Sequence, residues 1–215
     1  MTDFGLYLVI TNPVAGYAAC AEAAVCAGVG IIQLRMKHAS RGEIVREALE
    51  MRRVTAGTGT LFVVNDDPSI ADEVGADGVH VGQGDMAPAE VRRRFPGLRI
   101  VGLSTHNMEQ VEASWGEPVD YIGVGPVYAT PTKEIPDPTL GPELAGRMIA
   151  AASVPAVAIG GINAETLPPV LAAGAKNFAV VRAVCGSADP ESAIRGLKRC
   201  AADHSPAAGA ILRDF

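Results

Sequence analysis

Residues 61–85, LFVVNDDPSIADEVGADGVHVGQGD, contain the pattern that decides the fold of this chain. Two short apolar runs, at 61–66 and 78–82, flank a segment that starts with Asp67-Pro68 and predicts a helix. Each apolar run ends in residues that can bind a ligand: Asn65-Asp66 after the first, and Gln83 with Asp85 after the second. Strands need no such ends for structural reasons, so the pattern predicts that one rim of the fold carries a site.

The same unit recurs along the chain. Strands are expected at 6–11, 30–35, 61–66, 78–82, 100–104, 121–126, 156–161 and 178–182. Helices are expected between them at 14–28, 40–56, 68–75, 86–95, 107–116, 140–152, 163–173 and 189–203. Their start signals are a capping box at Ser40–Glu43, an Asp189-Pro190 start and a cap at Asn163.

Eight strand–helix units in 215 residues, about 27 residues each, predict an α/β protein that is a single (β/α)8 TIM barrel. An open doubly wound sheet of eight strands would show a long crossover or an edge strand of different composition, and neither is visible. We expect the barrel to span residues 1–203. Residues 204–215 are expected to form a tail, whose Ile211, Leu212 and Phe215 could dock on a neighbouring subunit of a homo-oligomer.

Composition and charge narrow the possible partners. The chain is 48% hydrophobic but only 5% aromatic, which suits a core of aliphatic strands buried on both faces. A net charge of −6 argues against nucleic acid or an anionic membrane, although small phosphorylated substrates can still bind locally. The N-terminus MTDFGLYLVITN lacks signal-peptide features, and no run approaches the roughly 18 apolar residues that span a bilayer.

The cysteines point to a reducing compartment. The chain has four: Cys20, Cys26, Cys185 and Cys200. They form no C-x-x-C pair and have no histidine cluster nearby, so we expect buried reduced thiols rather than disulfides or zinc ligands. A cytoplasmic location follows.

Asp66 and Asp85 end two consecutive strands. Adjacent strands lie about 4.7–4.9 Å apart, so the two carboxylates could share one hard cation, and Mg²⁺ is bound by such a pair together with phosphate oxygens and water. Both aspartates also precede expected helix starts, and the alternative is that they only cap those helices. Spacing alone leaves both interpretations open.

Cationic groups follow the strand ends as well. Two of only four lysines, Lys37 and Lys133, lie just past strand ends. Arg35, two residues before Lys37, would point the same way from its strand, so the pair is typical of an anion clamp. Either lysine alone would be interpreted as a solvated loop residue.

A second anion-binding region is expected at Thr130-Pro131-Thr132 and Gly160-Gly161. Threonine hydroxyls donate to phosphate oxygens, and glycines let backbone N–H groups approach closely. Barrels of this class often hold a phosphate at the loops after strands 7 and 8. His80 and His106 are expected to be structural histidines rather than bases, and no Ser-His-Asp or Cys-His arrangement is evident.

These motifs, in this order, resemble the thiamine phosphate synthase family. The segments that match are QLRMK at 33–37, ND at 65–66, GQGD at 82–85, LSTH at 103–106, TPTK at 130–133 and IGGI at 159–162. Each motif alone is modest, but six in register at strand ends are specific.

The resemblance implies a transferase of thiamine biosynthesis that joins an aminopyrimidine diphosphate to a thiazole phosphate, giving thiamine monophosphate and pyrophosphate. The residues implied to hold the pyrimidine diphosphate are Gln33, Arg35, Lys37, Asn65, Ser104 and Lys133, with Arg35, Lys37, Ser104 and Lys133 as the catalytic set. Asp66 and Asp85 would ligate Mg²⁺. The residues implied at the thiazole phosphate are Thr130, Pro131, Thr132, Gly161, Val181 and Arg182.

Arg182 departs from the family, which commonly has a small hydroxyl residue there. It could point inward to the phosphate, or outward to pair with Asp189 or Glu191 on the last helix, and we favour the outward case. Three other functions are weighed against the synthase. A thiazole tautomerase-like relative would lack the two aspartates, a Schiff-base aldolase would use Lys37 or Lys133 as nucleophile, and a non-catalytic thiamine-precursor binder would need no metal pair.

Overall fold

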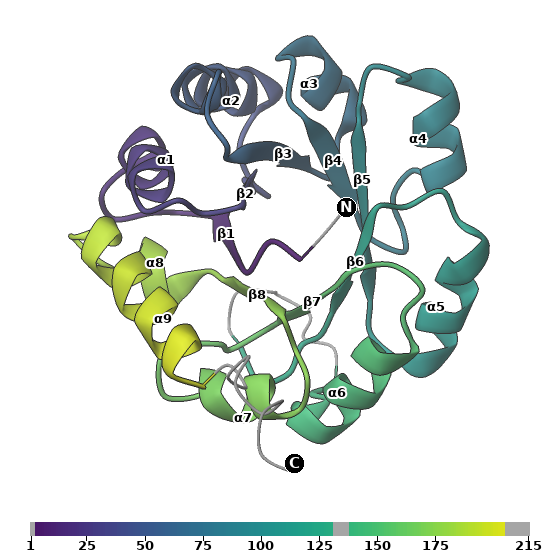
Figure 1. The fold of residues 1–215 in the computed structure, drawn as a ribbon. Helices are drawn as coiled ribbons and strands as arrows, with labels where there is room; N and C mark the ends of the chain where they lie inside the picture. Colours follow the sequence, from purple (N-terminus) through teal and green to yellow (C-terminus); the bar gives the residue numbers. More distant parts are fainter. Residues whose placement is uncertain (1–2, 131–137, 205–215) are drawn as a thin grey trace, which may run out of the picture.

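Eight parallel strands pair in sequence order and close on themselves, because β8 also pairs with β1 (Figure 1). This computed structural model describes residues 3–130 and 138–204. The strands are β1 (Leu6–Ile10), β2 (Ile31–Leu34), β3 (Leu61–Asn65), β4 (Gly78–Val81), β5 (Ile100–Thr105), β6 (Tyr121–Val124), β7 (Ala156–Ile159) and β8 (Asn177–Val180). The predicted (β/α)8 TIM barrel is confirmed.

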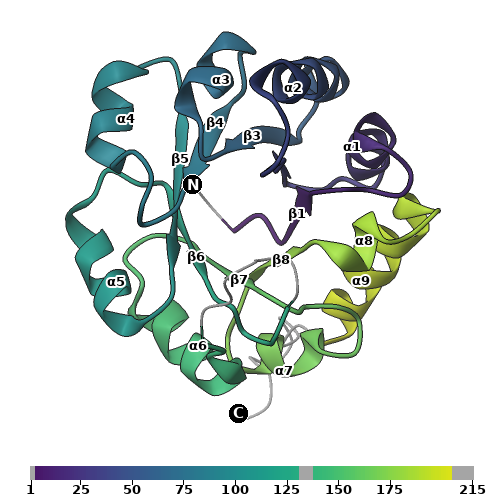
Figure 2. The same ribbon diagram turned by 180° about the vertical axis from the view of Figure 1, so that it is seen from behind.

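Helices form a ring outside the strands, as both ribbon views show (Figures 1 and 2). They are α1 (Tyr17–Cys26), α2 (Arg41–Thr55), α3 (Pro68–Glu73), α4 (Pro88–Arg94), α5 (Met108–Ala113), α6 (Gly141–Ala151), α7 (Leu167–Ala172), α8 (Arg182–Cys185) and α9 (Pro190–His204), with a 3-10 turn η1 (Ser114–Gly116) after α5. None of the described helices is long and apolar enough to cross a membrane.

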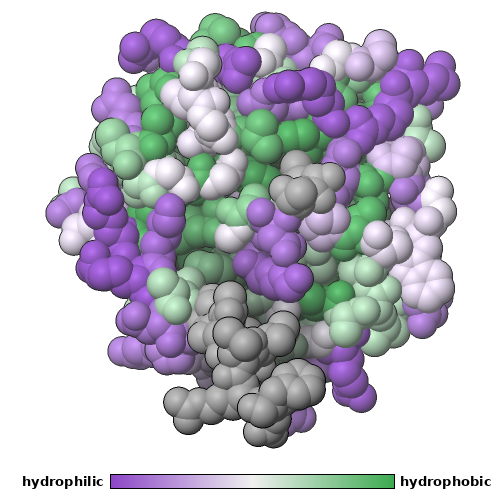
Figure 3. Space-filling view, in the orientation of Figure 1, coloured by the Kyte–Doolittle hydropathy of each residue, from purple (hydrophilic) through white to green (hydrophobic). Residues whose placement is uncertain are grey.

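The strands separate two hydrophobic cores, which explains their continuous apolar sequences. Alternate residues such as Leu8 and Ile10 face outward and pack beneath the helices. Their neighbours Tyr7 and Val9 face inward and join a smaller cluster with residues of the other strands, including Tyr121. Charged and polar side chains lie mostly over the outer helices in the space-filling view (Figure 3).

Local signals decide several helix ends. The capping box predicted at the start of α2 is present, since Glu43 N–H donates to Ser40 Oγ and Ser40 N–H donates to Glu43 Oε2. Asp189 accepts the N–H of Ser192 at the start of α9, as predicted. The expectation for Asn163 is wrong in its detail. Asn163 accepts N–H bonds within the turn 163–166, and α7 begins only at Leu167.

Two further expectations need correction. The strand expected at 178–182 ends at Val180, and the next residues turn into α8, whose four residues are too few to show a helical period in the sequence. The cysteines are free thiols as predicted, but only Cys20 and Cys185 are buried, while Cys26 is exposed. Of the tail expected at 204–215, His204 is instead the last residue of α9, and residues 205–215 lie outside the described residues.

Side chains at the amino rim hold neighbouring strands together. Asp77, just before β4, accepts the Phe62 N–H of β3 at 2.9 Å. Asp120, just before β6, accepts the Val101 N–H of β5 at 2.6 Å. Asn177, which begins β8, accepts two N–H bonds from residues 4–5, just ahead of β1. The same contact therefore recurs at three strand pairs, and it leaves the opposite rim available for a site.

Candidate active site

The predicted site residues within the described chain lie at the carboxyl ends of the strands. Arg35 and Lys37 follow β2, Asn65 ends β3, and Ser104 lies next to the end of β5. Gly160-Gly161 follows β7, almost opposite β3 in the closed barrel. Thr130 is described and follows β6, whereas Pro131, Thr132 and Lys133 lie outside the described residues. The sequence thus located the rim correctly, because all parallel strands end on the same side.

Lys37 and Asp66 form an ion pair across the ends of β2 and β3. Asp66 adopts a left-handed backbone conformation (φ 65°), and its N–H donates to the carbonyl of His80 at 2.8 Å. This bond ties the end of β3 to β4 and directs the carboxylate into the rim. An unusual φ in a non-glycine residue is a strained geometry of the kind that functional sites retain.

The electrostatics show that Asp66 and Asp85 act on one another. Burial raises the pKa of Asp66, the hydrogen bond from Lys37 opposes this shift, and the Asp85 carboxylate raises the pKa further. A carboxylate whose charge is disfavoured by a neighbouring carboxylate suits a divalent cation, which relieves the repulsion.

The alternative that these aspartates cap helices is wrong for both. The side chain that caps α3 is Asp67, which accepts the N–H groups of Ser69 and Ile70 at 2.8 and 3.1 Å. Asp85 instead accepts the Gly82 N–H at 2.7 Å within its own turn, and α4 starts without a side-chain cap. Neither carboxylate therefore caps a helix.

The donor set fits Mg²⁺ better than a softer metal. Two carboxylates on adjacent strands leave most coordination positions for phosphate oxygens and water, which Mg²⁺ prefers. Among residues 3–130 and 138–204, no three His, Cys, Asp or Glu side chains converge as a complete protein-only metal site would require. The two carboxylates present fit Mg²⁺ as a pair of ligands.

Arg35 adds a second cation to this region. Its side chain is half-buried, and burial lowers its pKa, while attraction to Asp66 acts in the opposite direction. Arg35 and Lys37 therefore both interact with the same carboxylate. Whether the two cations clamp a phosphate, as the sequence predicts, stays a prediction.

A chain of polar side chains crosses the barrel interior and was missed by the sequence analysis. Gln33 Nε2 donates to the Tyr7 hydroxyl at 2.7 Å, and this hydroxyl lies 2.8 Å from that of Tyr121. His80 Nδ1 lies 2.9 Å from the Tyr121 hydroxyl, and His80 Nε2 lies 2.9 Å from Ser104 Oγ. Both ring nitrogens of His80 thus have hydrogen-bond partners, and one of these partners is a predicted substrate-binding residue.

The glycine pair after β7 needs both of its glycines. Gly160 and Gly161 have φ values of 106° and 67°, which side chains disfavour. A Cβ on Gly161 would lie 2.7 Å from Tyr128 Cβ and 3.0 Å from the Ala129 carbonyl. The loop after β7 therefore packs directly against the loop after β6, and this places Gly161 beside the segment that leads to Thr130.

Arg182 is exposed and makes no ion pair with any described residue. The outward pairing suggested for it is wrong, because Asp189 caps α9 and Glu191 pairs with Arg195 at 2.7 Å. The side chain begins α8 instead of ending β8, so its direction is set by a helical turn. The four residues of α8 are too few to show helical periodicity, so the sequence did not indicate that Arg182 begins a helix.

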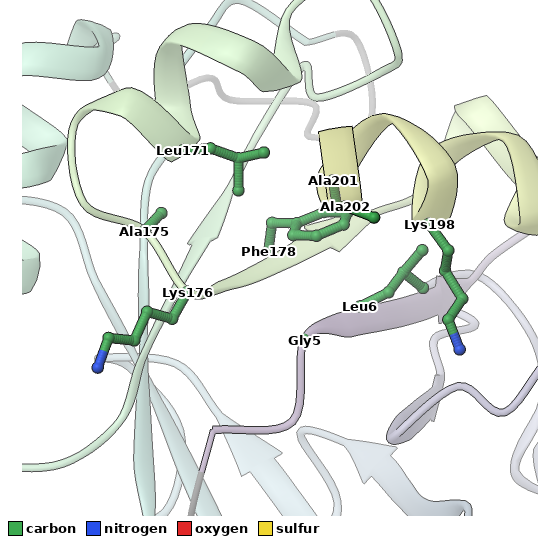
Figure 4. A pocket seen from close by; sticks show the side chains of 9 residues that line it. All are labelled: Gly5, Leu6, Leu171, Ala175, Lys176, Phe178, Lys198, Ala201 and Ala202. Carbon is green, nitrogen blue, oxygen red and sulfur yellow. The ribbon is translucent and has the colours of Figure 1, made fainter. Parts of the chain in front are cut away.

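The described surface also has a cavity of about 250 Å³, but it lies at the amino rim (Figure 4). Leu6, Leu171 and Phe178 form its apolar wall, with Lys176 and Lys198 on opposite sides. Lys198 donates to the carbonyls of residues 27–28, so its charge is already used to hold α9 against the end of α1. This cavity is on the opposite side of the barrel from the predicted chemistry.

Comparison with known proteins agrees with this geometry. The family model described as thiamine monophosphate synthase matches residues 6–184. The thiamine-phosphate synthase of Chloroflexus aurantiacus is 39% identical over 92% of this chain and 93% of that protein. That of Laribacter hongkongensis is 40% identical over 92% of this chain and 95% of that protein. The chain belongs to the thiamine monophosphate synthase family. This confirms the predicted family, enzyme class and function over the alternatives.

Solved structures show the same relationship. A thiamine phosphate pyrophosphorylase from Pyrococcus furiosus has a TM-score of 0.85 and 29% identity, and the match covers 94% of this chain and 96% of that one. Orotidine 5′-phosphate decarboxylase from Pyrococcus horikoshii has a TM-score of 0.65 at 14% identity, covering 91% and 99% of the two chains, and shares the fold alone.

Proposed function

We propose that this barrel joins an aminopyrimidine diphosphate to a thiazole phosphate at the rim described above, releasing pyrophosphate and forming thiamine monophosphate. The observation that carries the proposal is the group made by Lys37, Asp66 and Asp85, in which a cation and two interacting carboxylates meet at the ends of neighbouring strands. Such a group suits a diphosphate that binds with Mg²⁺. The glycine pair supports a second phosphate site almost opposite.

The diphosphate side uses the clamp and the residues next to it. We assign the pyrimidine diphosphate to Gln33, Arg35, Lys37, Asn65, Ser104 and Lys133. Asp66 and Asp85 would hold Mg²⁺, which supplies positive charge to the leaving pyrophosphate. Lys37, which pairs with Asp66, would share its charge with a phosphate oxygen when the substrate binds.

The chemistry needs cations more than acids or bases. The nucleophile is a thiazole ring nitrogen with a free lone pair, so no base must activate it. The electron-rich aminopyrimidine can carry positive charge on its methylene carbon as the C–O bond to the diphosphate breaks. The enzyme must then mainly stabilise the negative charge that develops on the pyrophosphate. Removing one preorganised hydrogen-bond donor to such a charge raises the activation free energy by about 2.7–4 kcal/mol.

The thiazole phosphate would bind across the barrel. The residues assigned to it are Thr130, Pro131, Thr132, Gly161, Val181 and Arg182. The close packing at Gly161 and the turn into α8 favour contacts from backbone N–H groups. The exposed side chain of Arg182 would contribute less than its N–H.

The test is pyrophosphate release from the two substrates with and without Mg²⁺. Asp66→Asn and Asp85→Asn should each stay folded and lose most turnover, because the metal loses a charged ligand. Asp72→Asn, an exposed aspartate on α3, is the matched control for loss of one carboxylate charge. Near-normal rates for either site variant at limiting Mg²⁺ would remove that residue from the metal site. Absence of any pyrophosphate release by the unmodified protein would refute the proposal in favour of a non-catalytic binder.

We further propose that the protein works in the cytoplasm, where its four free cysteines would stay reduced.

A further inference from the structure

In the buried chain of hydrogen-bonded groups from Gln33 to Ser104, each group can donate to the next in one of two directions along the chain. Its two ends are both residues assigned to the pyrimidine substrate, and its middle members, Tyr7, Tyr121 and His80, lie inside the barrel. Tyr7 is 2% exposed and Tyr121 is fully buried, so neither hydroxyl can turn to bulk water for a partner. Burial raises the pKa of both phenols well above the ordinary value, so each carries one proton at neutral pH.

Counting hydrogens selects one of the two possible directions. Gln33 Nε2 can only donate, so the Tyr7 oxygen accepts at that end and the Tyr7 proton must go to Tyr121. Tyr121 then donates to His80 Nδ1, and neutral His80 donates from Nε2 to Ser104 Oγ. In the reverse direction, with Gln33 Nε2 still facing Tyr7, the Tyr7 proton would face no acceptor among the described residues, an arrangement that costs the full desolvation of a buried donor.

Packing holds the chain in this arrangement. The Tyr121 ring stacks on the His80 ring, with centroids 5.5 Å apart and an interplanar angle of 26°. Gly102 of β5 leaves the space that both rings occupy, because a Cβ there would overlap the Tyr121 ring and lie 2.6 Å from His80 Nδ1. The Ser104 backbone is held in addition by Gln83, whose Nε2 donates to its carbonyl at 2.7 Å. The imidazole therefore has little freedom to rotate.

We propose that Tyr7, Tyr121 and His80 are positioning residues that fix His80 as the Nε2–H tautomer and thereby present the Ser104 hydroxyl as a hydrogen-bond donor to the pyrimidine substrate. Because Ser104 Oγ accepts from His80, its own proton is left for an acceptor atom of the ligand. The same chain links Ser104 to Gln33, so the two ends of the pyrimidine site are oriented together. The role of these three residues in catalysis rests on the proposed function, whereas the tautomer of His80 does not depend on it.

The tautomer can be read without turnover. In protein labelled with ¹⁵N-histidine, which has four histidines, the His80 signals are assigned by their loss in His80→Gln. We expect a neutral ring at pH 7–8 with the proton on Nε2 and an unprotonated Nδ1. An Nδ1–H tautomer or an imidazolium would overturn the proposal. This result stands even if the unmodified protein makes no thiamine phosphate, so it separates the two proposals.

Two isosteric variants test the direction. Tyr121→Phe removes the donor to His80 Nδ1, so the Nε2–H preference should be lost, and kcat/KM for the pyrimidine diphosphate should fall about tenfold. Tyr7→Phe leaves that donor in place, so His80 should keep its tautomer. In both variants the KM for the thiazole phosphate should stay within about twofold, because the hydroxyls removed act on the other substrate.

Tyr17→Phe serves as the control, since its hydroxyl accepts the Asn12 N–H near the surface and, among the described residues, takes no part in the chain from Gln33 to Ser104. A Tyr121→Phe protein with unchanged tautomer and unchanged pyrimidine kinetics would overturn the proposal. So would an equal loss toward both substrates, because that would indicate a merely structural role.

Discussion

Replacing Asp77 tests whether the repeated contacts at the amino rim stabilise the barrel. Asp77 is 6% exposed. One oxygen accepts the buried Phe62 N–H at 2.9 Å and lies 3.3 Å from Arg52, and the other lies 2.5 Å from Arg99. Asp77→Ala therefore leaves a strand N–H without a partner inside the protein.

The expected loss follows from these contacts. An unpaired buried N–H costs about 1–3 kcal/mol. The ion pair with Arg99 adds only about 0–1 kcal/mol, because the arginine side chain is 72% exposed and water screens the charge. Asp77→Ala should thus lower the free energy of unfolding by about 1–4 kcal/mol, and each kcal/mol lowers Tm by about 2–4 °C in a chain of this size. Asp77→Asn keeps an acceptor for Phe62 and should lose about 1 kcal/mol or less.

Equilibrium unfolding in urea, followed by circular dichroism at pH 7, measures both variants. Asp72→Ala, which removes an exposed aspartate, should change stability by no more than about 0.5 kcal/mol. If Asp77→Ala costs less than about 1 kcal/mol, or if Asp77→Asn costs as much as Asp77→Ala, the assignment of the energy to the Phe62 N–H is refuted. Turnover of folded Asp77→Asn should be normal, because the residue lies at the rim opposite the site.

Four other substitutions have defined outcomes. Lys37→Ala and Lys133→Ala should each lower kcat by about 100–1000-fold with little change in thiazole phosphate affinity, and a pure rise in the thiazole KM would place that lysine at the other phosphate. Arg182→Ser should weaken thiazole phosphate binding less than about tenfold in calorimetry, because the side chain is exposed; a larger loss would show that it turns inward on binding. Gly102→Ala should lower stability by about 1–3 kcal/mol and disturb the His80 tautomer, and a stable variant with unchanged His80 signals would contradict the packing described around Tyr121.

Much of the site could be predicted from sequence because it depends on local order. Polar residues such as Asn65 and Asp66 follow an apolar strand directly, and in a parallel barrel every such position falls on one rim. The capping box of α2 is equally local, since Ser40 and Glu43 are three residues apart. For these features, neighbours along the chain are also neighbours in space.

Other features depend on which strands face one another inside the closed barrel. Tyr7 and Tyr121 are 114 residues apart, and no spacing in the sequence indicates that their hydroxyls meet. The choice of Asp67 over Asp66 as the cap of α3 likewise follows from the left-handed backbone at Asp66 and its bond to His80.

The sequence by itself therefore determined the barrel, the rim and the chemical types of its groups, because strand and helix formation and the ends of parallel strands depend on residues close in the chain. Only the tertiary structure decided that Asp66 pairs with Lys37, that Arg182 lies exposed, and that a chain of hydrogen bonds reaches Ser104. These properties depend on barrel closure, which brings side chains from distant strands within hydrogen-bonding distance and excludes water from the bonds between them.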